Sequence, residues 1–158
     1  MKPRVYIETT IPSYYYDERP ELARDVARTR EWWDHERQQF DCVTSVVVVQ
    51  ELSAQGYRNR DRAVALLKGI SHLPITDEVD ALSVFYRHHM LLPRRAVFDA
   101  LHLALVCYHQ VDVLLTWNCA HLANTSKMKH LEVLNQRAGM HPPLLVTPHE
   151  LRFWEKTP

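Results

Sequence analysis

Short apolar runs alternate along the chain with segments whose apolar residues recur at helical spacing. The runs are rich in β-branched and aromatic residues, which is typical of buried strands, and they cover residues 4–8, 42–44, 73–76, 111–117 and 144–147. Between them, the spacing predicts helices over residues 21–40, 46–55, 59–70, 77–90, 94–110, 121–139 and 148–154. Strands that alternate with helices predict an α/β fold with a parallel sheet wrapped by helices. No linker or repeat interrupts the pattern, so we expect a single domain over residues 1–158.

Composition and charge narrow the classes of protein. Lys plus Arg and Asp plus Glu number 19 each, so any site for a polyanion must be a local patch. Three glycines cannot supply the phosphate loops GxGxxG or GxxxxGK[ST], and HExxH and paired Cys–His ligand spacings are missing. No apolar stretch approaches the roughly 20 residues that span a bilayer. Because the N-terminal segment also has no secretory h-region, we expect a cytoplasmic protein without membrane contact.

Three acids and one amide fall at the places where a parallel α/β sheet binds ligands. Glu8 ends the first predicted strand, Glu51 lies in the helix after the second, and Asp99 lies in the first turn of the helix after Pro93. Asn118 closes the strand over 111–117. Ligands of such sheets bind at the carboxyl ends of the strands, where the strand order reverses. A lone acid at a strand or helix end is most often solvated or capping.

Carboxylates brought together at one point repel one another, and a divalent cation relieves that repulsion. Mg²⁺ and Mn²⁺ prefer oxygen ligands, and in phosphodiester hydrolysis they supply hydroxide near neutral pH and stabilise charge on the phosphoryl oxygens. We therefore expect Mg²⁺ or Mn²⁺ at these residues. His102, one turn beyond Asp99, is expected to be a hydrogen-bond partner in a packed helix rather than a catalytic base.

The order of four segments resembles the PIN-domain ribonucleases, particularly the VapC-like toxins of type II toxin–antitoxin pairs. The segments are VYIETTIPSY, VTSVVVVQEL, RRAVFDALHLALV and DVLLTWNCAHLAN, and with the closing LLVTPHEL they cover nearly the whole chain. The resemblance implies a three-layer α/β/α fold with a parallel sheet of about five strands. It also implies a Mg²⁺- or Mn²⁺-dependent endoribonuclease that leaves a 5′-phosphate and a 3′-hydroxyl.

Residue by residue, the resemblance implies a catalytic set of Glu8, Glu51, Asp99 and Asn118, in which the first three hold the metal. Glu8 stands where the family usually has Asp, and Asn118 stands where it commonly has a fourth acid. Glu8 adds one methylene group, and the neutral Asn118 removes one negative charge. Because an amide oxygen still binds water or a cation, we expect Asn118 to tune the site without abolishing it.

Candidate substrate-binding residues lie beside these positions. Arg94 and Arg95 precede the helix of Asp99 and are placed to hold a phosphate, and Thr9 follows Glu8. Trp117 can stack on a base or pack in the core. Two basic segments, RNRDR at 58–62 and KMKH at 127–130, are candidate rims for RNA, although charged runs are usually solvated faces.

The resemblance further implies a homodimer and a cognate antitoxin that covers the active groove. Two other interpretations stay open. The neutral net charge and Asn118 favour a catalytically degenerate PIN-like module that binds RNA or protein. A Mg²⁺ phosphotransferase with a nucleophilic Asp after its first strand is a third class, which Glu8 at that position disfavours.

Overall fold

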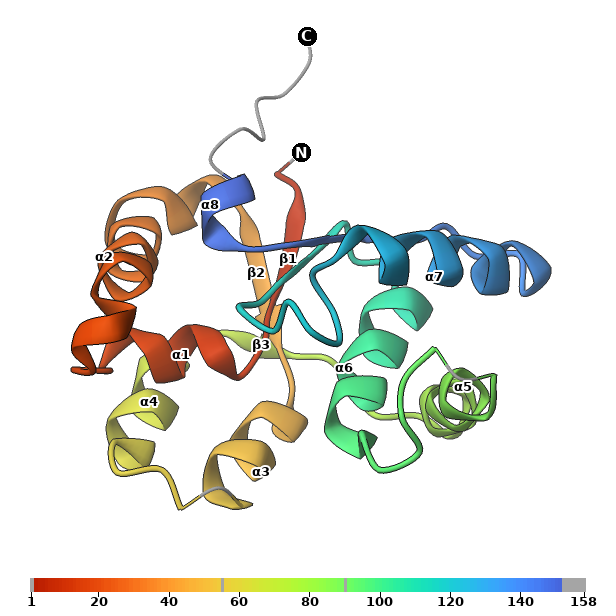
Figure 1. Ribbon diagram of the computed structural model, residues 1–158, viewed down its shortest axis with the longest axis horizontal. Coiled ribbons are helices and arrows are strands. Elements are labelled where there is room, and N and C mark those ends of the chain that lie inside the picture. The colour runs from red at the N-terminus through yellow and green to blue at the C-terminus, as the bar shows by residue number, and fades with distance from the viewer. Residues whose placement is uncertain (1, 55, 90, 152–158) are drawn as a thin grey trace, which may run out of the picture.

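Five parallel strands form the centre of the molecule, in the order β3–β2–β1–β4–β5 (Figure 1). The computed structural model describes residues 2–54, 56–89 and 91–151. The strands are β1 (Arg4–Ile7), β2 (Asp41–Thr44), β3 (Ser71–His72), β4 (Val113–Leu115) and β5 (Leu144–Val146). The strand order reverses between β1 and β4, which makes the carboxyl ends of these two strands the topological switch point of the sheet.

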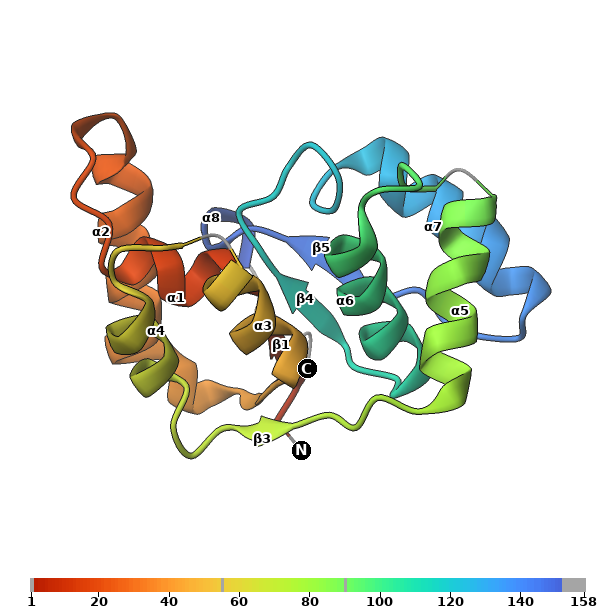
Figure 2. The same ribbon diagram turned by 90° about the horizontal axis from the view of Figure 1, so that it is seen from below.

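Helices cover both sides of the sheet and give three layers. They are α1 (Thr10–Tyr15), α2 (Ala23–Glu31), α3 (Val46–Ala54), α4 (Arg60–Leu66), α5 (Asp77–His88), α6 (Val97–Tyr108), α7 (Thr125–Arg137) and α8 (Pro148–Leu151). Helical turns η1 (Pro20–Leu22), η2 (Trp32–Glu36) and η3 (Arg37–Gln39) flank α2. Helices α1, α2 and α4 lie on one side of the strands and α5, α6 and α7 on the other (Figures 1 and 2), while α3 contacts both α4 and α6. The expected three-layer α/β/α fold with a five-stranded parallel sheet is confirmed.

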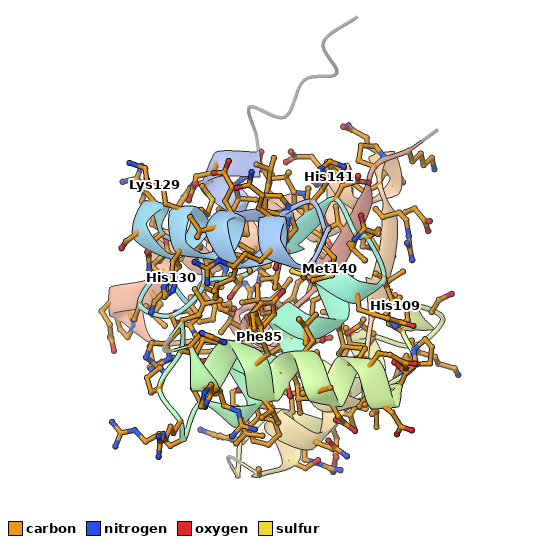
Figure 3. The ribbon with its side chains drawn as sticks, turned by 90° about the vertical axis from the view of Figure 1, so that its right-hand side faces the viewer. Phe85, His109, Lys129, His130, Met140 and His141 are labelled. Atoms are coloured by element: carbon orange, nitrogen blue, oxygen red, sulfur yellow. The ribbon has the colours of Figure 1, made fainter. Side chains whose placement is uncertain are left out.

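The core lies on both faces of the sheet, as a parallel sheet requires. Val5, Tyr6 and Ile7 of β1 are fully buried, and β4 is buried along its whole length. Figure 3 shows the side on which α5 and α7 face the solvent; Phe85 and Met140 are half-buried there and pack against the core. The burial of three successive β1 residues explains why residues 5–7 are all apolar.

One expected strand is displaced in the structure, and one helix was not expected; proline accounts for the displaced strand. The strand expected over 73–76 is β3 at Ser71–His72, because Pro74 has no N–H to donate to a strand ladder. Leu73 still donates to the Thr44 carbonyl at 2.8 Å, and the pairing stops there. Helix α1 was not expected, since its sequence TIPSYY is poor in helix formers. The ends of the helices expected over 46–55, 77–90 and 148–154 lie partly outside the described residues.

The described helices were also compared with the length of a bilayer. None of them is both long and apolar enough to cross a membrane.

Candidate metal site at the switch point

The carboxyl ends of β1 and β4 and two helices bring the predicted site residues to one place. The Glu8 amide continues the β1–β4 ladder by donating to the Leu115 carbonyl at 3.2 Å, so Glu8 lies directly at the switch point. Helix α3, which follows β2, carries Glu51, and α6 carries Asp99 in its first turn and His102 one turn later. Parallel strand ends and the helices that follow them thus gather residues that are far apart in sequence.

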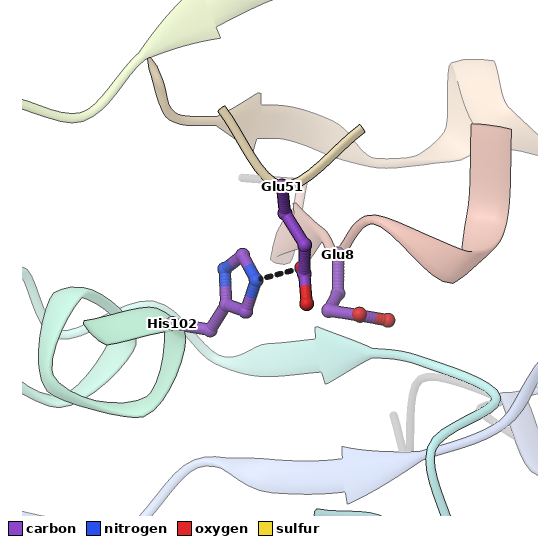
Figure 4. Close-up of side chains that lie close together, drawn as sticks. All are labelled: Glu8, Glu51 and His102. Atoms are coloured by element: carbon purple, nitrogen blue, oxygen red, sulfur yellow. Dashed lines mark hydrogen bonds and ion pairs between the residues drawn. The ribbon is translucent and has the colours of Figure 1, made fainter. Parts of the chain in front are cut away.

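Glu8, Glu51 and His102 form the deeper part of the site, here called the inner cluster. One ligand atom from each lies within 4.8 Å of the others (Figure 4). Glu8 and His102 are buried, and the Glu51 side chain is 12% exposed. Two carboxylates at this spacing could hold a divalent cation, and the imidazole lies beside them.

A buried chain of hydrogen bonds holds one oxygen of Glu51. His102 Nε2–H donates to Glu51 Oε1 at 2.9 Å, and the Thr9 hydroxyl donates to the same oxygen. On the other side of the ring, His102 Nδ1 and the Tyr6 hydroxyl are hydrogen-bonded at 2.7 Å. Tyr6 is in turn hydrogen-bonded to Ser45 Oγ at 2.7 Å. The orientation of Glu51 is therefore set from within the core.

One oxygen of Glu8 is held in the same manner by threonines. Glu8 Oε2 accepts from the Thr10 amide at 3.1 Å, from the Thr10 hydroxyl at 2.6 Å and from the Thr116 hydroxyl at 2.6 Å. Among the described residues, nothing donates a hydrogen bond to Glu8 Oε1 or to Glu51 Oε2. Each buried carboxylate therefore keeps one oxygen for a ligand while the protein holds the other.

Burial and charge shift the pKa values of the inner cluster in different directions. Desolvation raises the pKa of Glu8 above its ordinary value, although the charge of His102 acts against it. For Glu51, burial also raises the pKa, but the hydrogen bond and charge of His102 outweigh it and the pKa falls. Burial lowers the pKa of His102, but the hydrogen bond to Glu51 and the charges of the nearby carboxylates have the larger effect. The pKa of His102 is therefore raised. Glu8 is thus the carboxylate that gains most from a cation.

Asp99, Asn118 and His121 form a second group, here called the outer cluster. Asp99 Oδ1 accepts from Asn118 Nδ2 at 3.3 Å, and Asp99 Oδ2 is hydrogen-bonded to His121 Nδ1 at 2.8 Å. Asn118 also accepts from the His121 amide at 3.0 Å. Asp99 contributes to raising the pKa of His102, so its charge acts on the inner cluster. It is outside the group of three ligand atoms within 4.8 Å.

The residues expected to bind substrate have different surroundings. Arg94 and Arg95 are exposed in the turn before α6, and the Arg94 carbonyl accepts from Arg87 Nη1 at 3.0 Å. Thr9 is 3% exposed and bonds to Glu51. Trp117 is half-buried, donates to Thr29 Oγ1 at 2.9 Å and stacks on Tyr14 at 5.5 Å between ring centroids. Of its two expected roles, this geometry favours packing.

Sequence reasoning found the acids but missed part of the chemistry. His102 was expected to be a hydrogen-bond partner, and the structure shows that its partners are Glu51 and Tyr6. His121 was not anticipated. The sequence does contain a sign of its position, because His121 follows Asn118 by three residues. An Asn side chain commonly accepts a hydrogen bond from a backbone amide shortly after it in the chain.

The sequence was also compared with known proteins. No protein-family model matches it, and no curated protein is significantly similar to it.

Proposed function

We propose that the chain is a metal-dependent endoribonuclease of the PIN type. The observation that carries the proposal is the inner cluster at the switch point, where Glu8 and Glu51 each have one oxygen held by the protein and one to which no described residue donates. Buried carboxylates in close proximity favour a cation between them. When bound, Mg²⁺ or Mn²⁺ would supply an activated water and charge stabilisation for phosphodiester hydrolysis.

The residues of the chain then have distinct roles in the proposed reaction. Glu8 and Glu51 hold the cation through their free oxygens. His102 is a positioning residue, because it holds Glu51 Oε1 and is itself held by Tyr6. Asp99 is assigned to the side of the site nearer the solvent, where its His121 partner is 40% exposed, and it holds or accepts a proton of the attacking water.

Substrate contacts in this proposal come from exposed cations beside the outer cluster. Arg94 and Arg95 precede α6 and are exposed, so they are free to contact phosphate oxygens. Asn118 replaces an acid with a neutral donor and acceptor, and its amide is bonded to Asp99. It reduces the negative charge that an incoming phosphodiester meets. The toxin role, the homodimer and the antitoxin partner stay predictions from the resemblance.

A non-catalytic binding module is the second candidate, and one observation favours it. Glu51 and Asp99 each already have a histidine within 2.9 Å, which is a partner for their charge in the absence of metal. A module that only binds RNA or protein needs no divalent ion. Metal dependence therefore separates the two candidates.

The test measures cleavage of a mixed RNA by the purified chain, by Glu51→Gln and by Asp99→Asn, each with Mn²⁺, Mg²⁺ or EDTA. We expect the parent to cleave only with metal, and each variant to lose about 100-fold or more in rate. Asp80→Asn, an exposed acid on α5, is the matched control and should cleave like the parent. Metal-independent cleavage, or equal rates in all four proteins, would contradict the proposal. No cleavage by the folded parent with either metal would favour the binding module.

A further inference from the structure

A polar cavity lies at the end of α1 that is farther from the inner cluster. Its volume is about 520 Å³, and Asp17, Glu18, Arg19, Tyr57, Arg58 and Arg62 line it. Helix α1 begins beside Glu8 and ends at Tyr15, just before the cavity, and α4 lies alongside it (Figures 1 and 2). Six helical residues extend roughly 9 Å, which two or three nucleotides cover at the roughly 3.4 Å rise of a stacked strand.

Two arginines of this cavity have no acidic partner among the described residues. Arg19 is bound by Asp17 through a bidentate pair, with Nη2–Oδ2 at 2.7 Å and Nε–Oδ1 at 3.0 Å. Arg58 and Arg62 are exposed and make no ion pair within the described chain. The guanidinium of Arg62 lies 4.5 Å from the centre of the Tyr16 ring. The cavity therefore offers two free cations on a wall whose one buried acid is already neutralised.

The walls of the cavity are anchored to α1. The Tyr57 hydroxyl donates to the Ser13 carbonyl at 2.5 Å, and Asn59 Nδ2 donates to the Tyr16 carbonyl at 3.3 Å. These bonds hold the segment between α3 and α4 against the end of α1. Tyr57 lines the cavity and is half-buried, so an aromatic surface lies beside the two arginines. Arginines beside a fixed aromatic ring are the usual means of holding single-stranded nucleic acid.

We propose that this cavity is a second RNA subsite, in which Arg58 and Arg62 bind the backbone phosphates of a single strand and Tyr57 supports a base. That the ligand is RNA rests on the proposed function, whereas the cavity and its arginines are observed independently of it. The strand would run along α1 from the inner cluster to the cavity. The negative charge of Glu18, which also lines the cavity, repels the phosphates. Arg60 is outside the subsite because it pairs with Asp61 at 2.9 Å.

The test measures binding of a short fluorescent single-stranded RNA of mixed sequence in EDTA, so that no metal-dependent cleavage interferes. The double variant Arg58→Ala/Arg62→Ala should bind roughly tenfold or more weakly at 0.1 M salt, and its salt slope should fall by about 1.4, or 0.7 per lost phosphate contact. Glu18→Gln should bind up to about fivefold more tightly. Tyr57→Leu should weaken binding with an unchanged salt slope.

The matched control is Lys2→Ala/Arg137→Ala, which removes two exposed charges that do not line the cavity, one just before β1 and one on α7. Equal losses in both double variants would show a net-charge effect and overturn the subsite. RNA binding that neither Glu18→Gln nor the arginine variant changes would overturn it too. Binding of an acidic peptide that depends on Arg58 and Arg62, without RNA binding, would assign the cavity to a protein partner.

The outcome is separable from that of the proposed nuclease activity. If the parent cleaves RNA with metal while the arginine variant binds and cleaves normally, the subsite is wrong and the nuclease stands. If the parent never cleaves but the arginine variant loses RNA binding as expected, the subsite stands and the nuclease does not.

Discussion

The site contains two pairs of a carboxylate and an imidazole that differ in depth. His102 and Glu51 are 2.9 Å apart with side chains 0% and 12% exposed, whereas His121 and Asp99 are 2.8 Å apart with side chains 40% and 13% exposed. The distances and the exposed fractions of the two carboxylates are nearly equal, but the His102 ring is buried, whereas water reaches and screens the His121 ring. Breaking a buried pair leaves an uncompensated charge, while a screened pair contributes little. The inner pair therefore belongs to the fold, whereas the outer pair can exchange its partners with water.

The largest expected effect is on stability when each histidine is removed. His102→Ala should lower the free energy of unfolding by about 3 kcal/mol, because Glu51 and Tyr6 both lose a buried partner. His121→Ala should lower it by less than about 1 kcal/mol. Urea denaturation in EDTA measures both. Similar losses for the two variants would show that the depth of the pair is not what matters.

An intermediate effect is expected when the outer cluster gains an acid. Asn118→Asp replaces the amide that donates to Asp99 with a like charge, so the metal-free protein should lose about 1 kcal/mol of stability. Added Mn²⁺ should raise the thermal midpoint of this variant by more than it raises that of the parent, since the extra charge attracts the cation. Gln136→Glu, an exposed added charge on α7, is the control. A variant that responds to Mn²⁺ less than the parent would contradict this account.

The smallest expected effect is the pH dependence of the metal-free protein. The pKa of His102 is higher in the folded than in the unfolded protein. The contribution of His102 to stability is therefore complete below the unfolded pKa of about 6.5, and it is lost as the pH rises through the folded pKa. Glu8, whose pKa is also raised, changes stability in the same direction. The pKa of Glu51 is lowered, so Glu51 stabilises the folded protein at pH values above its unfolded pKa. This stabilisation is lost only in acid, as the pH falls through the folded pKa.

The thermal midpoint in EDTA should therefore be lower near pH 8 than near pH 6. In His102→Gln the difference should shrink. A midpoint that rises over this range would contradict the directions assigned to His102 and Glu8.

Local sequence patterns were sufficient to predict most of the fold and the acids of the site, but not the roles of its histidines. The apolar run of β1 and the position of Glu8 after it follow from the pattern of residues 4–8, and Thr76 directly before the acidic first turn of α5 is the residue type that caps a helix start. The side chain of Thr76 does accept from the Val79 amide at 3.2 Å. Helix α1 could not be predicted, because its residues are poor helix formers and only packing against α2 and α4 stabilises it.

The roles of the two histidines depend on contacts that are distant in sequence. His102 lies in the apolar run LHLALV, where the pattern indicates a core residue but not its partners. Its bonds to Glu51 and Tyr6 join positions that are 51 and 96 residues away. The convergence of Glu8 with Glu51 was predictable only through the rule that ligands gather at strand ends. Separation of Asp99 from them into an outer cluster required the side-chain geometry.

The central claim is that the free oxygens of Glu8 and Glu51 hold a divalent cation, and Mn²⁺ titration calorimetry of the purified chain tests it most directly. The parent, Glu8→Gln, Glu51→Gln and the control Gln136→Glu would be compared at the same pH. We predict a site in the parent and the control, with affinity reduced roughly tenfold or more in both glutamine variants. Equal Mn²⁺ affinity in all four proteins, or none in the folded parent, would contradict the claim.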